Sequence, residues 1–228
     1  MSPANLNEAS LEELIVDQMV GNNGAPGWVE GDPKNFNAAY CLDLLTFREF
    51  ISETQPALID ALDLNGDSPT THKFLARLQG EITKHGIVAC LRDGVTHGQH
   101  HIDLYYPTPV AQNVKAAAQF ATNRLTITRQ VHYSTSGSSK SLDLVASVNG
   151  LPIATFELKN QITTQTVEDA VKQYKTDRDP REPIFAFGRC MVHFAVDDHH
   201  VRFCTQLDGT SSWFLPFDQG NKVAPETP

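Results

Sequence analysis

The sequence predicts a mixed α/β protein, and three patterns in its 228 residues predict it. The N-terminal part shows apolar residues at helical spacing, whereas residues 125–133 alternate apolar and polar side chains with the period of a half-buried strand. Two β-rich runs then meet at Asn149-Gly150, a dipeptide that strongly favours a two-residue hairpin turn. A helical pattern over about 167–178 follows this hairpin.

Helical spacing organises the N-terminal third of the chain. Apolar residues recur on one face of a first helix over about 10–20, and Ser10 begins an S-x-x-E pattern that predicts its N-terminal cap. A second helix is expected over about 43–54, and a third ends at Gly86. Nothing separates these helices from the rest by a low-complexity linker, so one domain is expected.

After the third helix the pattern changes to short apolar runs that are typical of strands. Thr166 is the predicted N-cap of the helix after the hairpin, and Pro180 lies beyond its end. The expected elements in chain order are strands at 87–91 and 101–106, a helix at about 111–123, strands at 125–133, 141–148 and 152–158, a helix at about 167–178, and strands at 191–196 and 201–205.

Composition excludes several classes of protein. With 40% apolar and 20% charged residues the chain is neither disordered nor collagenous, and no window approaches the apolar length of a membrane span. The N-terminus lacks a secretory pattern, so a cytoplasmic protein without a membrane partner is expected. A net charge of −9 argues against an evenly basic surface for nucleic acid. The four scattered cysteines are expected to be buried free thiols.

The expected hairpin carries a D…E-x-K pattern made of Asp143, Glu157 and Lys159. Residues two apart on a strand face the same side, so Glu157 and Lys159 project together. Two carboxylates from adjacent strands can hold Mg²⁺, whose bound waters supply a nucleophile, while the ammonium of Lys159 orients the water or offsets phosphorane charge. The alternative is a structural salt bridge between Lys159 and one carboxylate, because such patterns also occur on exposed strand faces.

This site makes a geometric demand. With a plain two-residue turn at Asn149-Gly150, Asp143 would pair with Phe156 and point away from Glu157. A shared metal site therefore requires a three-residue loop or a β-bulge in the hairpin. We predict that Asp143 lies beside Glu157, and a regular two-residue hairpin would exclude the site.

Several motifs along the chain together resemble the N-terminal nuclease domain of the R (restriction, or motor) subunit of type I restriction–modification enzymes. The resemblance extends from about residue 10 to about residue 220. The motifs that carry it are Arg129-Gln130, Leu142-Asp143-Leu144-Val145, Asn149-Gly150-Leu151-Pro152, Glu157-Leu158-Lys159-Asn160, Thr166 to Ala170, Gln173-Tyr174, Asp177 to Pro180, His193 to Asp197, Phe214 to Phe217, Thr54-Gln55-Pro56 and the helix with Glu12.

The resemblance implies a PD-(D/E)xK, RecB-like fold, a central mixed sheet flanked by helices, and Mg²⁺-dependent cleavage of double-stranded DNA, with Mn²⁺ as a substitute ion. It assigns Asp143 and Glu157 as metal-binding carboxylates and Lys159 as the catalytic lysine. Glu12 on the first helix would reach the metal directly or through water. The implied metal ligands are Asp143, Glu157, the backbone carbonyl of Leu158, and Glu12. The candidates for DNA binding or support of the site are Gln173, which the resemblance implies, and Arg129 and Lys172.

The sequence departs from the family pattern in two places. The family's Q-x-x-x-Y motif would place tyrosine four residues after Gln173, where this chain has Asp177, and Tyr174 points elsewhere on the helix. A small residue often precedes the catalytic aspartate by three positions, and here that residue is Lys140.

The resemblance also implies an assembly. Residues 1–220 would form the endonuclease domain, with a helical part at about 1–86 and a catalytic core at about 87–215, and residues 221–228 would lead toward a missing motor. ATP would bind only in that helicase or translocase, since the chain has no phosphate-binding loop. The expected partners are double-stranded DNA and the methyltransferase (M) and specificity (S) subunits.

Two other functions stay open at this point: a catalytically silent docking module of the motor subunit, and a stand-alone structure-specific nuclease. Single residues also carry alternatives. Arg129 could equally bind a DNA phosphate or pair with a carboxylate. Lys172 could contact a backbone phosphate or be exposed to solvent. Arg178 is expected to form a helix-end ion-pair network with Asp177 and Asp179.

Overall fold

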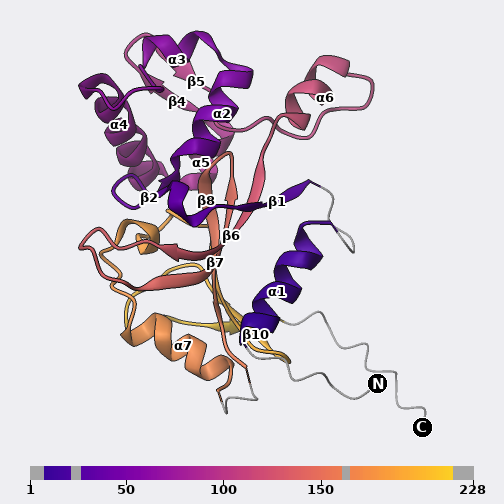
Figure 1. Cartoon of the computed structure of the whole chain (residues 1–228), viewed down its shortest axis with the longest axis vertical. Coiled ribbons are helices and arrows are strands. Elements are labelled where there is room, and N and C mark those ends of the chain that lie inside the picture. Colours follow the sequence, from indigo (N-terminus) through magenta and orange to yellow (C-terminus); the bar gives the residue numbers. More distant parts are fainter. Residues whose placement is uncertain (1–7, 22–26, 161–164, 218–228) are drawn as a thin grey trace.

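The computed structural model describes residues 8–21, 27–160 and 165–217. Its centre is a seven-stranded mixed sheet in the order β1-β6-β7-β8-β9-β10-β11 (Figure 1). The β1–β6 and β8–β9 pairs are parallel and the other four are antiparallel. This confirms the predicted mixed α/β fold with a central sheet between helices. The strands are β1 Trp28–Gly31, β6 Leu125–His132, β7 Ser141–Val148, β8 Leu151–Leu158, β9 Val192–Val196, β10 Val201–Cys204 and β11 Leu215–Pro216.

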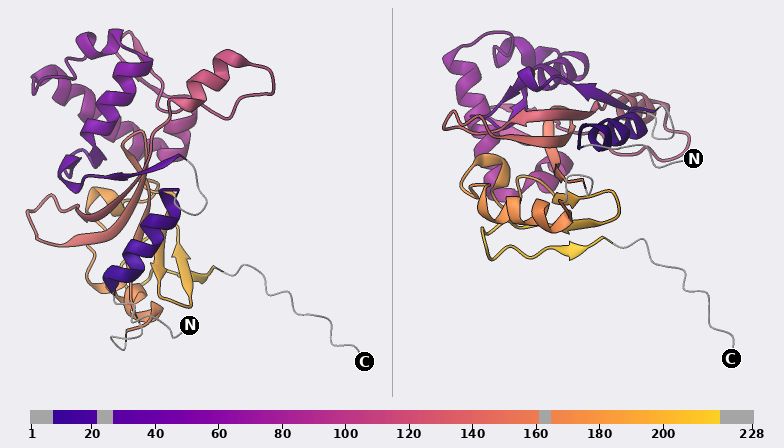
Figure 2. Two further views of the ribbon diagram at one scale, coloured as in Figure 1. Left: turned by 45° about the vertical axis from the view of Figure 1, so that its right-hand side comes forward. Right: turned by 60° about the horizontal axis from the view of Figure 1, so that its bottom comes forward.

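Two helices cover opposite faces of the sheet, α1 (Glu8–Met19) and α7 (Val167–Thr176) (Figures 1 and 2). Strand β8 shows the two faces directly: Leu158 packs in the core beneath α1, whereas the Thr155 hydroxyl lies 2.8 Å from the Tyr174 hydroxyl of α7. Thr166 caps α7 in a capping box with Asp169, as predicted.

The remaining helices form a second layer beyond the end of the hairpin, around their own core (Figure 1). Ser68 and Asp43 cap two of them through their side chains, and Phe47 stacks on Phe74 with centroids 6.2 Å apart. Helix α6 projects from this group and buries none of its side chains (Figure 2). The elements are η1 Pro33–Asn35, β2 Phe36–Asn37, β3 Leu42–Asp43, α2 Leu44–Thr54, α3 Ala57–Ala61, α4 Pro69–His85, α5 Ile87–Asp93, β4 Val95–His97, β5 His100–Ile102, α6 Val114–Ala121 and, near the sheet, η3 Pro183–Phe185.

Three sequence predictions are wrong in this region. The expected strand at 87–91 is helix α5, which buries Ile87 and Cys90 at helical spacing; a short apolar run fits either element. The expected strand at 101–106 ends at residue 102, because the side chain of Gln55 bonds the backbone of the next residue. Ser10 lies inside α1, which already includes Glu8, and is not its cap.

The β7–β8 hairpin meets the geometric demand of the predicted site. Asn149 and Gly150 take positive φ values of 51° and 81°, and Val148 pairs with Leu151, so the turn has two residues. The register then shifts at a β-bulge in which Ile153 is the extra residue of β8. Beyond the bulge Leu144 pairs with Phe156. The next positions along the two strands, Asp143 and Glu157, therefore lie side by side.

Two further expectations concern the chain as a whole. All four cysteines are free and buried, as predicted. In the part of the chain that the structure describes, no helix is long and apolar enough to cross a membrane.

Candidate active site

Asp143 and Glu157 lie together at the far end of the hairpin from its turn. The Leu158 backbone N–H donates a hydrogen bond of 2.7 Å to Asp143 Oδ2, which ties the aspartate of β7 to the strand that carries Glu157. The charge of Asp143 also raises the pKa of Glu157, as expected for neighbouring carboxylates. The predicted juxtaposition of these two acids is confirmed.

Glu157 has no exposed surface and pairs with a buried arginine. Its Oε1 accepts from Arg178 Nε at 2.7 Å and lies 2.6 Å from Nη2. Arg178 also donates to the Tyr133 hydroxyl at 3.1 Å and to the Ser141 carbonyl at 2.7 Å, and its guanidinium lies 5.4 Å from the centre of the Tyr133 ring. Five contacts, to Glu157, Tyr133 and Ser141, therefore fix this guanidinium against the carboxylate.

The predicted helix-end network around Arg178 is wrong. Asp179 instead pairs with Arg181 at 2.7 Å on the surface, and Arg178 turns inward to the sheet. The prediction failed because Arg178 follows the last turn of α7, where helical periodicity no longer tells which way a side chain points.

The second oxygen of Glu157 is suited to a cation. Oε2 is buried and has no hydrogen-bond partner among the described residues. Burial raises the pKa of Glu157 to about 8, with a further contribution from Asp143, although Arg178 and Lys159 lower it. A buried oxygen without a donor, beside a second carboxylate, fits a hard divalent ion.

A metal at this position would depend on few protein ligands. Among the described residues there is no group of three or more His, Cys, Asp or Glu side chains that could hold a metal ion. Two carboxylates, a backbone oxygen and waters are nevertheless a set that Mg²⁺ accepts, since it usually keeps several waters. The assignments of the Leu158 carbonyl and of Glu12 as ligands stay predictions.

Glu12 reaches the same region from α1. Its Oε2 accepts a hydrogen bond of 2.7 Å from Gln130 Nε2 of β6. Burial raises the pKa of Glu12, the charge of Asp143 raises it further, and Arg129 lowers it. Gln130 lies opposite Asp143 in the pairing of β6 with β7, so its hydrogen bond brings Glu12 to this part of the sheet.

Lys159 continues from β8 at the edge of the site. Its backbone N–H donates to the Val196 carbonyl at 2.8 Å, which extends the pairing with β9. It lies two residues beyond Glu157, and its charge lowers the pKa of that carboxyl. The projection of Glu157 and Lys159 to a common side stays a prediction.

The other predicted site residues have different surroundings. Arg129 Nε lies 2.9 Å from Glu30 Oε1, so it has the carboxylate partner that was one of its two options. On α7, Gln173 is half-buried and Lys172 is exposed, and their contacts with DNA stay predictions. Tyr174 is buried in the core and points away from Gln173, as expected.

Sequence reasoning missed two residues that organise the site, Arg178 and Gln130. Gln130 links Glu12 to Ser141, whose hydroxyl donates to Gln130 Oε1 at 2.9 Å. Neither residue lies in the D…E-x-K pattern. The sequence signal for each is its place in a motif that resembles the R subunit: Gln130 follows Arg129, and Arg178 lies within Asp177 to Pro180.

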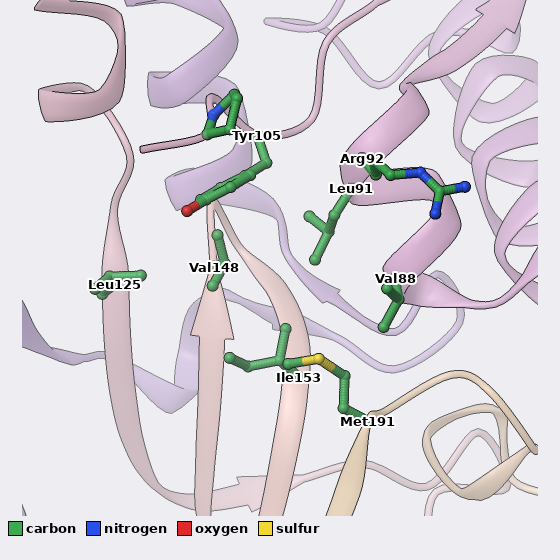
Figure 3. A pocket seen from close by; sticks show the side chains of 9 residues that line it. Val88, Leu91, Arg92, Tyr105, Leu125, Val148, Ile153 and Met191 are labelled. Carbon is green, nitrogen blue, oxygen red and sulfur yellow. The ribbon is translucent and has the colours of Figure 1, made fainter. Parts of the chain in front are cut away.

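An apolar pocket of about 380 Å³ lies elsewhere, near the turn end of the hairpin (Figure 3). It contains none of the carboxylates, and Arg92 at its edge pairs with the exposed Asp93 at 2.7 Å. It is therefore separate from the candidate site. The lining residues are Val88, Leu91, Arg92, Tyr105, Pro107, Leu125, Val148, Ile153 and Met191.

A comparison with known protein families identifies the family of this chain. The sequence model of the family described as type I restriction enzyme R protein N terminus matches residues 5–212, nearly the whole chain. The chain belongs to this family. No curated protein matches it. The match implies that the chain is the N-terminal part of a type I restriction enzyme R subunit.

Proposed function

We propose that this R-subunit chain is a Mg²⁺-dependent endonuclease module that hydrolyses phosphodiester bonds of double-stranded DNA, the deoxyribonuclease part of a type I restriction enzyme. The observation that carries the proposal is the β-bulge at Ile153, which brings Asp143 beside Glu157. A regular hairpin would have separated them. A buried carboxylate oxygen without a donor lies at the same place.

In this proposal Asp143, Glu157, the Leu158 carbonyl and Glu12 hold the ion, directly or through water. A bound Mg²⁺ supplies Lewis acidity and lowers the pKa of a coordinated water. Lys159 positions the attacking water or offsets the charge that develops on the phosphorane.

Arg178 has a supporting function in the same chemistry. It binds Oε1 of Glu157, so Oε2, which has no hydrogen-bond partner among the described residues, would be available to the ion. Its charge also favours the ionised form of Glu157, which is the form that binds a cation.

Helix α7 carries two of the residues that would contact DNA. Lys172 and Gln173 would contact the DNA backbone, and Arg129 would do so only if it left Glu30. The net charge of −9 predicts weak DNA affinity for this chain alone, because phosphate neutralisation supplies most non-specific binding energy. The M and S subunits and the ATP-driven translocase of the same R subunit would bring DNA to the site, in the cytoplasm.

One observation favours a second function, that of a catalytically silent docking module. Arg178 already places a positive charge against Glu157, so this acid has a structural partner without any metal. In that case the buried pair would only stabilise the fold.

Replacement of the two acids in the assembled type I enzyme separates these functions. Asp143→Asn and Glu157→Gln should each abolish DNA cleavage while ATP hydrolysis by the motor continues, because the motor chemistry lies elsewhere. Glu13→Gln, on the exposed side of α1, is the matched control and should cleave normally. Unchanged cleavage by Asp143→Asn and Glu157→Gln would establish the docking function instead.

A further inference from the structure

Gln130 has an unusual backbone conformation for a residue in a strand. It lies inside β6 with a φ of +50°, a left-handed value that residues other than glycine rarely adopt and that strains the backbone. The register shows where this occurs: Arg129 pairs with Leu144 and Val131 with Leu142, so Gln130 lies opposite Asp143. The strained residue and the candidate metal ligand are therefore cross-strand neighbours.

The strands change the face that they present at this point. Ile127 belongs to the core beneath α1, whereas Val131, four residues later, belongs to the core beneath α7. Strict alternation would have placed both on one face. In Figure 1 the paired strands β6 and β7 turn away from β8 in the same region.

The Gln130 side chain uses this position to connect the two sides of the site. Its Nε2 donates to Glu12 at 2.7 Å and its Oε1 accepts from the Ser141 hydroxyl at 2.9 Å. A carboxylate can only accept, so the amide has a single sensible orientation. The Ser141 carbonyl in turn accepts from Arg178, the partner of Glu157. A continuous chain of contacts thus joins Glu12 to Glu157.

We propose that Gln130 is a positioning residue that holds the Glu12 carboxylate toward Asp143, and that the left-handed backbone is retained because it places the amide between α1 and β7. The inference rests on the proposed function, since it concerns a ligand of the same cation. Gln130 is not needed to dock α1, because Leu11 and Val16 of that helix are buried against the sheet.

The variant Gln130→Gly tests this, because glycine accepts the positive φ while the amide is lost. Gln112→Gly is a closely matched control: Gln112 is also an exposed glutamine with positive φ, 76°, and it lies outside the site before α6. Both variants should melt at or above the wild-type temperature. Only Gln130→Gly should weaken Mn²⁺ binding, measured by calorimetry, by about tenfold, as for the loss of other residues that orient a metal ligand.

A second background shows whether Gln130 acts through Glu12. In Glu12→Ala, the further change Gln130→Gly should leave the Mn²⁺ affinity unchanged, whereas an equal loss there would overturn the inference. Gln130→Asn keeps a residue that tolerates positive φ but shortens the amide, so it should also weaken binding and serves if the glycine variant does not fold.

The two proposals fail in distinguishable ways. Wild-type affinity in both Gln130→Gly and Gln130→Asn would overturn the inference about Gln130 alone. Absence of Mn²⁺ binding to the wild-type chain would overturn the proposed function, and the positioning of Glu12 with it.

Discussion

The buried pair of Arg178 and Glu157 makes a specific prediction for Arg178→Met. The Arg178 side chain is 4% exposed and that of Glu157 is 0% exposed, so water cannot replace the lost guanidinium. The change removes the hydrogen bonds to Glu157, Tyr133 and Ser141 and leaves a carboxyl group in the core. Breaking a buried pair on one side costs about 3–5 kcal/mol. Loss of the guanidinium raises the pKa of Glu157 further above its wild-type value of about 8, so at pH 9 the carboxyl would bind a proton instead of staying charged, and we expect the lower end of this range.

Urea denaturation at pH 9, where Glu157 of the wild type is ionised, measures the change in the free energy of unfolding, with the slope against urea unchanged. Arg181→Met is the matched control: its side chain is 89% exposed, and loss of its surface pair with Asp179 should change stability by less than about 1 kcal/mol. The double variant Arg178→Met with Glu157→Gln should recover much of the lost stability, because no charge is left unpaired.

A loss of less than about 1 kcal/mol for Arg178→Met, or no recovery in the double variant, would refute this reasoning. The pair would then be a minor contact and could not fix the orientation of Glu157.

Three further predictions follow from single residues. Gly150→Ala should destabilise the chain by at least about 2 kcal/mol in urea, because φ is +81° and an added Cβ would collide with the Asp43 carbonyl; wild-type stability would show that the turn is not constrained. Burial lowers the pKa of His193 to about 4, so between pH 4 and the ordinary value of 6.5 the unfolded state binds more protons than the folded state. The free energy of unfolding should therefore fall as the pH is lowered from about 6.5 to 4. In urea denaturation this fall should be about 3 kcal/mol larger in the wild type than in His193→Gln. Since burial raises the pKa of Glu157 to about 8, a cation must displace a proton below that pH, and Mn²⁺ affinity from calorimetry should rise by up to about tenfold per pH unit between pH 6 and 8; a flat profile would contradict this.

The hairpin was predictable because its signals are local. Asn149-Gly150 specifies the turn, and side-chain alternation then shows that Asp143 and Glu157 can meet only if one strand gains a residue. The sequence did not identify Ile153 as that residue, but Pro152 beside it cannot donate to a regular ladder, which suits a bulge.

The supporting residues were not predictable for a physical reason. Arg178 pairs with Glu157 across 21 positions, and its direction depends on how the chain leaves α7. The positive φ of Gln130 has no sequence signal, since glutamine is not a residue that favours it. Helix α5 was misread because five apolar residues suit a strand or a buried helix, and packing against the helical core decides between them.

The claim on which the account depends is that Asp143 and Glu157 together hold a divalent cation. Calorimetric titration of Mn²⁺ into the wild-type chain and Asp143→Ala at pH 8, with and without a short DNA duplex, tests it most directly. We predict binding in the wild type that is lost in Asp143→Ala and retained in Glu13→Ala, whose side chain is exposed on α1. Absence of binding in the wild type even with duplex present, or equal binding in wild type and Asp143→Ala, would contradict the claim.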